Sequence, residues 1–187
     1  MLNYTSSITE NKNYADLIIN EISPIMKLNL RGKKKEFLPT VEKTLNMILP
    51  TEPNTSSSSE KLTAIWLSPD EWMIFSNNIA EKNNNNYEIE EILYNNISKK
   101  SFGSVTDVTD QFVMINFNGT KIFDLFSFGS PFDFSKFKEK KGSTTQTILN
   151  HIDVIIHNKN SNNVNLFVRR SFSEHLWSWI NDCASRL

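Results

Sequence analysis

The sequence predicts an α+β fold made of two topologically related βαββα (ferredoxin-like) halves, which share a mostly antiparallel sheet with helices packed on it. Three observations lead to this prediction. Apolar residues switch repeatedly between the period of two typical of strands and the period of 3.6 typical of helices. The first elements follow the order βαββα, closed by a further strand, which is the split βαβ unit. The order then starts again after residue 119, although the two halves share no visible sequence identity.

The first half begins with a strand over 25–30, where apolar side chains alternate with polar ones. Residues 36–49 form the first predicted helix, because their apolar side chains fall within about one third of a helical wheel. Two strands follow over 62–67 and 71–76, and the Ser-Pro-Asp sequence between them predicts a tight turn. A helix is predicted over 87–99, since its acidic residues come first and its lysines last, which complements the helix dipole.

A strand over 105–117 closes the first pattern, and the second half follows it. The helix over 120–128 ends at a glycine with a proline just beyond, a common helix ending. Residues 144–157 and 164–170 predict a second hairpin. The final helix covers 171–184, where a serine followed three residues later by a glutamate matches the capping-box pattern.

Length and composition predict the domain organisation. Residues 1–23 hold one short apolar cluster in a polar context, so we expect an N-terminal arm or short helix. Residues 24–187 are expected to form a single globular domain, because ~100–200 residues per domain is usual. A net charge of −1 argues against nucleic-acid or anionic-membrane partners. The longest apolar runs reach four residues, far below the ~20 of a membrane span.

No catalytic or metal-binding group is predicted. The five glycines are scattered and form no phosphate-binding loop. His151 and His157 share a face of one predicted strand, but about 20 Å separates them at ~3.3 Å per residue, too far for one metal ion. Asp107 and Asp110 stand at odd spacing on a strand, so they point to opposite faces and form no acid–base pair. Cys183 is the single cysteine and is expected in the core, since it shares a helical face with several apolar side chains.

Aromatic residues are the remaining anomaly. Six phenylalanines crowd residues 123–137, and core packing is the leading interpretation for most of them. Trp177 falls roughly 110° from the centre of its predicted apolar face, which contains Phe172 and Cys183, so it is expected to face a partner. An aromatic surplus outside the core is typical of a partner surface. The interface candidates are Phe128, Phe132, Phe134 and Trp177.

Several short sequence motifs resemble corresponding segments of the gamma subunit of heterotetrameric sarcosine oxidase. They occur in order over the span 27–184, and W-L-S-P-D-E-W and V-R-R-S-F are the specific ones. The words are Lys27–Gly32, Trp66–Trp72, Asp107–Asp110, Asp153–Ile156 and Phe167–Phe172 with Leu176–Trp179. Phe112 departs from the pattern, where a basic residue is expected, and so do Thr144 and Thr145, where smaller residues are commoner.

The resemblance implies an accessory role without catalytic residues. Such complexes oxidise sarcosine to glycine and pass the one-carbon unit to tetrahydrofolate or release it as formaldehyde, so the chain would serve sarcosine catabolism and one-carbon metabolism. FAD, FMN, NAD and zinc are expected on the other subunits, and the expected partners are the alpha, beta and delta subunits. The isolated chain could also form a homo-oligomer. The lack of a secretory signal adds a cytoplasmic location to these expectations.

Two alternatives remain open. The implied fold is similar to the folate-binding module of the glycine-cleavage T-protein, so the chain could be a stand-alone folate-binding module. A pterin site needs a carboxylate and aromatic walls, and the candidates for these are Trp66, Glu71, Trp72 and Asp107. The other alternative is an independent enzyme, which would have to turn over sarcosine without added cofactors.

Overall fold

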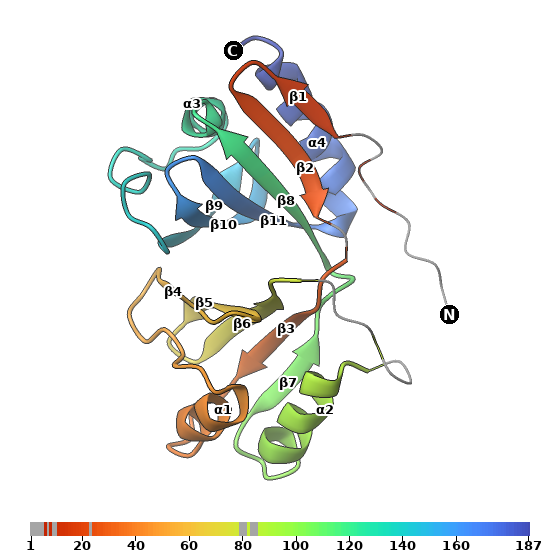
Figure 1. The fold of residues 1–187 in the computed structure, drawn as a ribbon, viewed down its shortest axis with the longest axis vertical. Helices are drawn as coiled ribbons and strands as arrows, with labels where there is room; N and C mark the ends of the chain where they lie inside the picture. Colours follow the sequence, from red (N-terminus) through yellow and green to blue (C-terminus); the bar gives the residue numbers. More distant parts are fainter. Residues whose placement is uncertain (1–5, 7, 9–10, 23, 79–81, 83–85) are drawn as a thin grey trace. The chain divides into compact units, whose positions relative to one another are not determined.

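The chain folds into two compact units. The computed structural model describes residues 6, 8, 11–22, 24–78, 82 and 86–187. Unit 1 combines Met1–Pro24 with Asp110–Leu187, and unit 2 is Ile25–Thr109. Unit 1 contains a six-stranded sheet, here sheet A, and unit 2 a five-stranded sheet, here sheet B (Figure 1). The α+β class and the antiparallel pairing are confirmed, but the strands divide between two sheets and do not form the single sheet that the sequence suggested.

Unit 2 has the ferredoxin-like strand order that the sequence predicted. Its elements are β3 (Lys27–Arg31), α1 (Phe37–Leu45), β4 (Ser56–Ser58), β5 (Leu62–Ser68), β6 (Glu71–Ser76), α2 (Glu88–Leu93), the π-helical segment η1 (Tyr94–Ser98) and β7 (Ser104–Asp107). The strands lie in the order β4-β5-β6-β3-β7, all antiparallel. Strands β3 and β7 come from the two ends of this unit in sequence and pair with each other, with β7 at the edge of the sheet and β3 between β7 and β6.

The helices of unit 2 are shorter than the sequence predicted. Helix α1 ends at Leu45 because Asn46 adopts a left-handed conformation, with φ of 49°, and closes the last turn through its backbone N–H to Glu42. The predicted helix over 87–99 divides into α2 and η1. Helix α2 keeps the predicted acidic first turn, and the Glu90 carboxylate accepts a hydrogen bond from the backbone N–H of the N-cap residue Tyr87 at 3.3 Å.

Unit 1 repeats this topology with one strand taken from the N-terminus. Its elements are β1 (Lys12–Tyr14), β2 (Leu17–Ile22), β8 (Phe112–Gly119), α3 (Ile122–Ser127), β9 (Thr144–Leu149), β10 (Ile152–Asn160), β11 (Asn163–Arg169) and α4 (Arg170–Ala184). The order is β1-β2-β8-β11-β10-β9. The four strands β2-β8-β11-β10 have the same order as β7-β3-β6-β5 in unit 2, so β2 takes the place of a fourth strand after α4.

The N-terminal segment therefore belongs to a sheet. Residues 17–22 form β2, not a short helix, and pair with β8 along their whole length from Leu17–Gly119 to Ile22–Met114. The side chains of Leu17 and Ile19 are buried in the core of unit 1. The N-terminal part of unit 1 thus ends at Pro24, and unit 2 begins at Ile25. Residues 1–5, 7, 9–10 and 23 of the predicted arm lie outside the described residues.

The predicted strand over 105–117 is two strands that belong to different sheets. Strand β7 pairs with β3 in unit 2, whereas β8 pairs with β2 and β11 in unit 1. The interruption is local: the side-chain carboxylate of Asp107 accepts a hydrogen bond from the backbone N–H of Thr109 at 2.8 Å, which is an Asx turn. The chain leaves unit 2 immediately after this turn.

The predicted strand over 144–157 is also interrupted. Asn150 and His151 both have positive φ values, 50° and 64°, and form the two-residue turn between β9 and β10. Strands β9, β10 and β11 therefore form a three-stranded meander. His151 lies in the turn and not on a strand face with His157.

Helices α3 and α4 pack on one face of sheet A, and the core of unit 1 lies between them and the strands. Helix α4 begins at Arg170, so the predicted serine–glutamate pair does not cap it; its N-cap is Arg169, which makes no side-chain capping bond. Among the helices of the described residues, none is both long and apolar enough to cross a bilayer.

Candidate functional site

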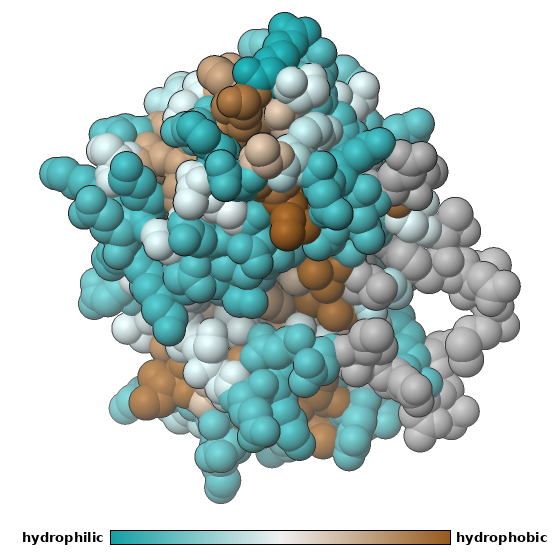
Figure 2. All heavy atoms as spheres, turned by 45° about the horizontal axis from the view of Figure 1, so that its top comes forward, coloured by the Kyte–Doolittle hydropathy of each residue, from teal (hydrophilic) through white to brown (hydrophobic). Residues whose placement is uncertain are grey.

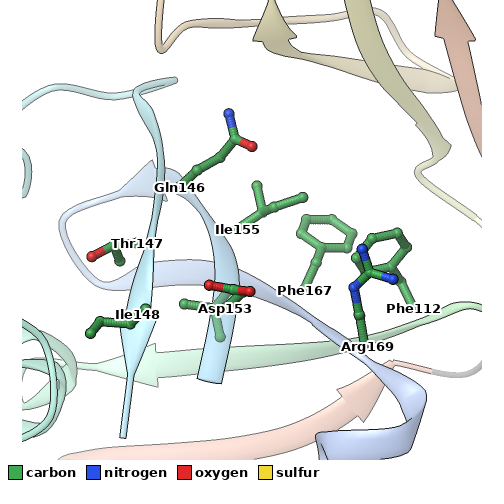
Figure 3. A pocket seen from close by; sticks show the side chains of 9 residues that line it. Phe112, Gln146, Thr147, Ile148, Asp153, Ile155, Phe167 and Arg169 are labelled. Carbon is green, nitrogen blue, oxygen red and sulfur yellow. The ribbon is translucent and has the colours of Figure 1, made fainter. Parts of the chain in front are cut away.

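A hollow of about 590 Å³ lies on sheet A and is lined by residues of unit 1 (Figure 3). Its lining residues are Phe112, Gln146, Thr147, Ile148, Asp153, Val154, Ile155, Phe167 and Arg169. Most of these side chains lie on the second face of the sheet, opposite α3 and α4. Four strands, β8 to β11, therefore contribute to one site although their residues are up to 57 positions apart, from Phe112 to Arg169.

Strand register explains why these side chains meet. Antiparallel pairing places Ile155 opposite both Gln146 and Phe167, which makes one row across three strands. Ile155 and Phe167 are buried and form the apolar part of the lining. Side chains directly opposite each other on one face of a sheet lie within contact range, so this row is a continuous surface.

A second row carries the charges. Arg169 lies opposite Phe112, and Asp153 lies opposite Ile148. Because β10 and β11 are antiparallel and Val154 pairs with Val168, Asp153 lies opposite Arg169. Both side chains project from the same face of the sheet. Both side chains are exposed. Figure 3 shows the guanidinium group of Arg169 and the carboxylate of Asp153 apart from each other in the lining of the hollow.

His157 also lies on this face but has a different environment. Its side chain is 4% exposed, and burial, with a smaller effect of Lys159, lowers the pKa of the imidazole to about 4. His157 is therefore neutral at neutral pH. Among the described residues, no group of three or more His, Cys, Asp and Glu side chains is arranged to hold a metal ion.

The four folate candidates do not converge on one site. Trp66 and Trp72 form a cross-strand pair on the face of sheet B that packs against α1 and α2. Trp72 is 2% exposed, and its indole N–H donates to the carbonyl of Pro50 at 2.8 Å. Glu71 follows the opposite pleat and accepts a hydrogen bond from the side-chain amide of Asn29 at 2.7 Å. The Glu71 carboxylate and the indoles of Trp66 and Trp72 thus lie on different faces of the sheet.

Asp107 is occupied by structural contacts. Its carboxylate pairs with the Lys82 ammonium at 2.6 Å and accepts the Thr109 backbone hydrogen bond of the Asx turn. Partial burial alone would raise the pKa of Asp107, but these hydrogen bonds outweigh it, so the pKa lies below its usual value. The carboxylate therefore stabilises the connection between β7 and the chain that follows.

Most of the crowded phenylalanines are core residues. Their ring centroids lie 5.0–6.3 Å apart, mostly tilted or edge to face, which is the favoured geometry of aromatic pairs. The rings are those of Phe123, Phe126, Phe132, Phe134 and Phe137. Among the interface candidates, Phe134 is buried, Phe132 is partly buried and Phe128 is 61% exposed. On the face shown in Figure 2, hydrophobic residues form small separate areas within a mainly hydrophilic surface.

Trp177 lies in the core and not on the surface. It is 7% exposed, and the buried positions of α4 are Ser173, Leu176, Trp177, Ile180 and Ala184, a regular helical stripe. The helical-wheel interpretation placed the centre of this stripe incorrectly, because it counted Phe172 as a core residue. Phe172 is 50% exposed and lies outside the stripe.

Comparison with known proteins identifies the family. The sequence profile described as "Sarcosine oxidase, gamma subunit family" matches residues 32–186, which is most of the chain. The chain belongs to the sarcosine oxidase gamma subunit family. No curated protein matches the sequence. Sequence words that predicted this gamma-subunit family contribute five lining residues to the hollow: Asp153, Val154, Ile155, Phe167 and Arg169.

Solved structures have the same fold at low sequence identity. A chain of the heterotetrameric sarcosine oxidase from Corynebacterium sp. U-96 is similar with a TM-score of 0.80 and 19% identity, over 91% of this gamma-family chain and 84% of that chain. The glycine cleavage system aminomethyltransferase T from Bartonella henselae is similar with a TM-score of 0.56 and 9% identity, over 89% of this chain and 45% of that chain. The predicted similarity to the T-protein fold is thus confirmed.

Proposed function

We propose that this chain is a non-catalytic accessory subunit of a flavin-dependent sarcosine oxidase complex. The observation that carries the proposal is the family match over residues 32–186. The similar chain in the Corynebacterium enzyme belongs to a heterotetramer, which supports a multi-subunit assembly for this chain as well. We propose the alpha, beta and delta subunits as its partners, with FAD, FMN, NAD and zinc bound by those subunits.

Exposed aromatic side chains support partner binding. Phe128 presents a mostly exposed ring at the end of α3, beside a core of unit 1 that already contains five buried phenylalanines. Exposing a large apolar ring has no benefit for an isolated soluble chain, and aromatic residues are enriched at protein interfaces. Phe128 is therefore the interface residue that we propose from the original four candidates.

Co-expression of this chain with the alpha, beta and delta subunits tests the proposal. The tagged chain is expected to co-elute with them from an affinity column and by size exclusion. Phe128→Ala should weaken this association about ten-fold or more, as expected for an interface aromatic. The matched control is Tyr94→Ala, which removes a half-exposed ring from unit 2. A chain that never co-elutes with those subunits would contradict the proposed function.

A stand-alone folate-binding module is the alternative. The separation of Glu71 from the Trp66–Trp72 pair across sheet B gives this alternative no assembled pterin site among the predicted residues. Titration of tryptophan fluorescence with a reduced folate distinguishes the two functions. Saturable quenching by the isolated chain would favour folate binding, whereas an unchanged signal would favour the accessory subunit.

A further inference from the structure

The hollow on sheet A combines an apolar lining with two opposite charges. Phe112 and Ile148 supply accessible hydrocarbon surface, one opposite Arg169 and the other opposite Asp153, whereas Ile155 and Phe167 are buried beneath the hollow. Asp153 and Arg169 supply one negative and one positive group on the adjacent row. Small-molecule sites likewise combine apolar surface with a few polar groups that set the orientation of the ligand. The volume of about 590 Å³ also lies within the ~300–1,000 Å³ that such sites span.

The two charges do not neutralise each other. Asp153 and Arg169 are neighbours on β10 and β11, yet neither takes part in the ion pairs found among the described residues, which join groups within 4.0 Å. Figure 3 shows the guanidinium group of Arg169 apart from the carboxylate of Asp153. Two opposite charges that share a face without pairing leave both groups available to a molecule that carries the complementary pair.

We propose that this hollow binds a zwitterionic amino acid with an apolar side chain. The ligand carboxylate would accept hydrogen bonds from Arg169, whose planar guanidinium suits a carboxylate. The ligand ammonium would donate to Asp153. The side chain would pack on the half-buried ring of Phe112 and on the exposed side chain of Ile148, where an aromatic side chain gains most from the phenyl ring. All the side chains that this ligand would contact belong to this chain, so the proposal does not rest on the accessory role.

The charge arrangement also excludes simpler ligands. A monocarboxylate would gain from Arg169 but meet the negative charge of Asp153, and an amine would meet the reverse. A ligand without charges would leave both groups without a new partner. Selectivity for the zwitterion over either singly charged analogue is therefore the distinguishing property of the site.

NMR titration of the 15N-labelled full chain tests the proposal with L-phenylalanine as the probe. We expect saturable shifts in residues of β9, β10 and β11. 3-Phenylpropionate and 2-phenylethylamine, which each lack one of the two charges, should bind about ten-fold more weakly. Glycine should also bind more weakly, because it has no side chain to cover the apolar lining.

Charge-removing variants make the test specific. Arg169→Gln and Asp153→Asn should each weaken L-phenylalanine binding about ten-fold. Asp153→Asn should at the same time strengthen 3-phenylpropionate binding, because it removes the repulsion. The matched control is Arg186→Gln, which removes a guanidinium from the other end of α4, where it pairs with Asp182 at 2.7 Å; it should leave the dissociation constant unchanged.

Two outcomes would overturn the proposal. The first is an absence of saturable shifts in β9–β11 with L-phenylalanine at tens of millimolar, provided that the amide spectrum shows a folded chain. The second is binding that Arg169→Gln and Asp153→Asn both leave unchanged, since the charges would then play no part. Failure to co-elute with other subunits would affect only the proposed accessory role.

Discussion

Replacing Trp177 in α4 tests the difference between the helical wheel and the structure. The wheel interpretation counts Phe172 as core and Trp177 as exposed, whereas the structure has Trp177 7% exposed and Phe172 50% exposed. A tryptophan side chain buries roughly 150–250 Å², and each Å² contributes about 25 cal/mol. Trp177→Ala should therefore lower the free energy of unfolding by about 4 kcal/mol, within the ~3–5 kcal/mol found for such truncations. Phe172→Ala should cost less than about 1 kcal/mol.

Urea unfolding followed by far-UV circular dichroism measures both changes. Circular dichroism is preferable to tryptophan fluorescence here, because the substitution removes one of the four tryptophans that would report. Because total stabilities are about 5–15 kcal/mol, Trp177→Ala can leave a partly unfolded chain, so Trp177→Leu serves as the milder variant. Equal losses for Trp177→Ala and Phe172→Ala, or a larger loss for Phe172→Ala, would refute the burial argument.

Three further predictions concern local contacts. Gly119 has φ of 145°, and a Cβ there would collide with the carbonyl of Asp16, so Gly119→Ala should lower the free energy of unfolding by about 1–3 kcal/mol in the same urea assay. Because the folded pKa of Asp107 lies below its unfolded value, its contribution is present above about pH 4 and lost as the pH falls further; Asp107→Asn should flatten the acid limb of the stability profile. NMR titration of His157 should show a neutral imidazole until about pH 4, and a midpoint near 6.5 would contradict its burial.

The helices and most strands could be predicted because their patterns are local. The polarity of charge in α2 and the turn between β5 and β6 depend only on residues close in sequence. Helix ends were less predictable, since Asn46 ends α1 through a left-handed conformation that other residues at that position adopt less readily. The same limit applies to Asn150 and His151, where a polar and a basic residue form a turn inside an apparently continuous strand.

The hollow could not be predicted as a site from the sequence. In the sequence, Asp153 and Arg169 stand out only as members of two family motifs, Asp153–Ile156 and Phe167–Phe172. Their proximity arises because β10 and β11 pair in one register. The folate candidates show the converse: Glu71 and Trp72 are adjacent in sequence, but the pleat of β6 directs their side chains to opposite faces of the sheet.

The sequence by itself determined the elements, the repeated topology and the family, because periodicity, turn residues and family words are all read along the chain. Only the tertiary structure decided that the strands form two sheets, that β2 completes the second half and that Trp177 is buried. These features depend on hydrogen bonds and contacts between segments far apart in sequence, such as β2 with β8. No local sequence pattern specifies which strand pairs with a given edge of a sheet.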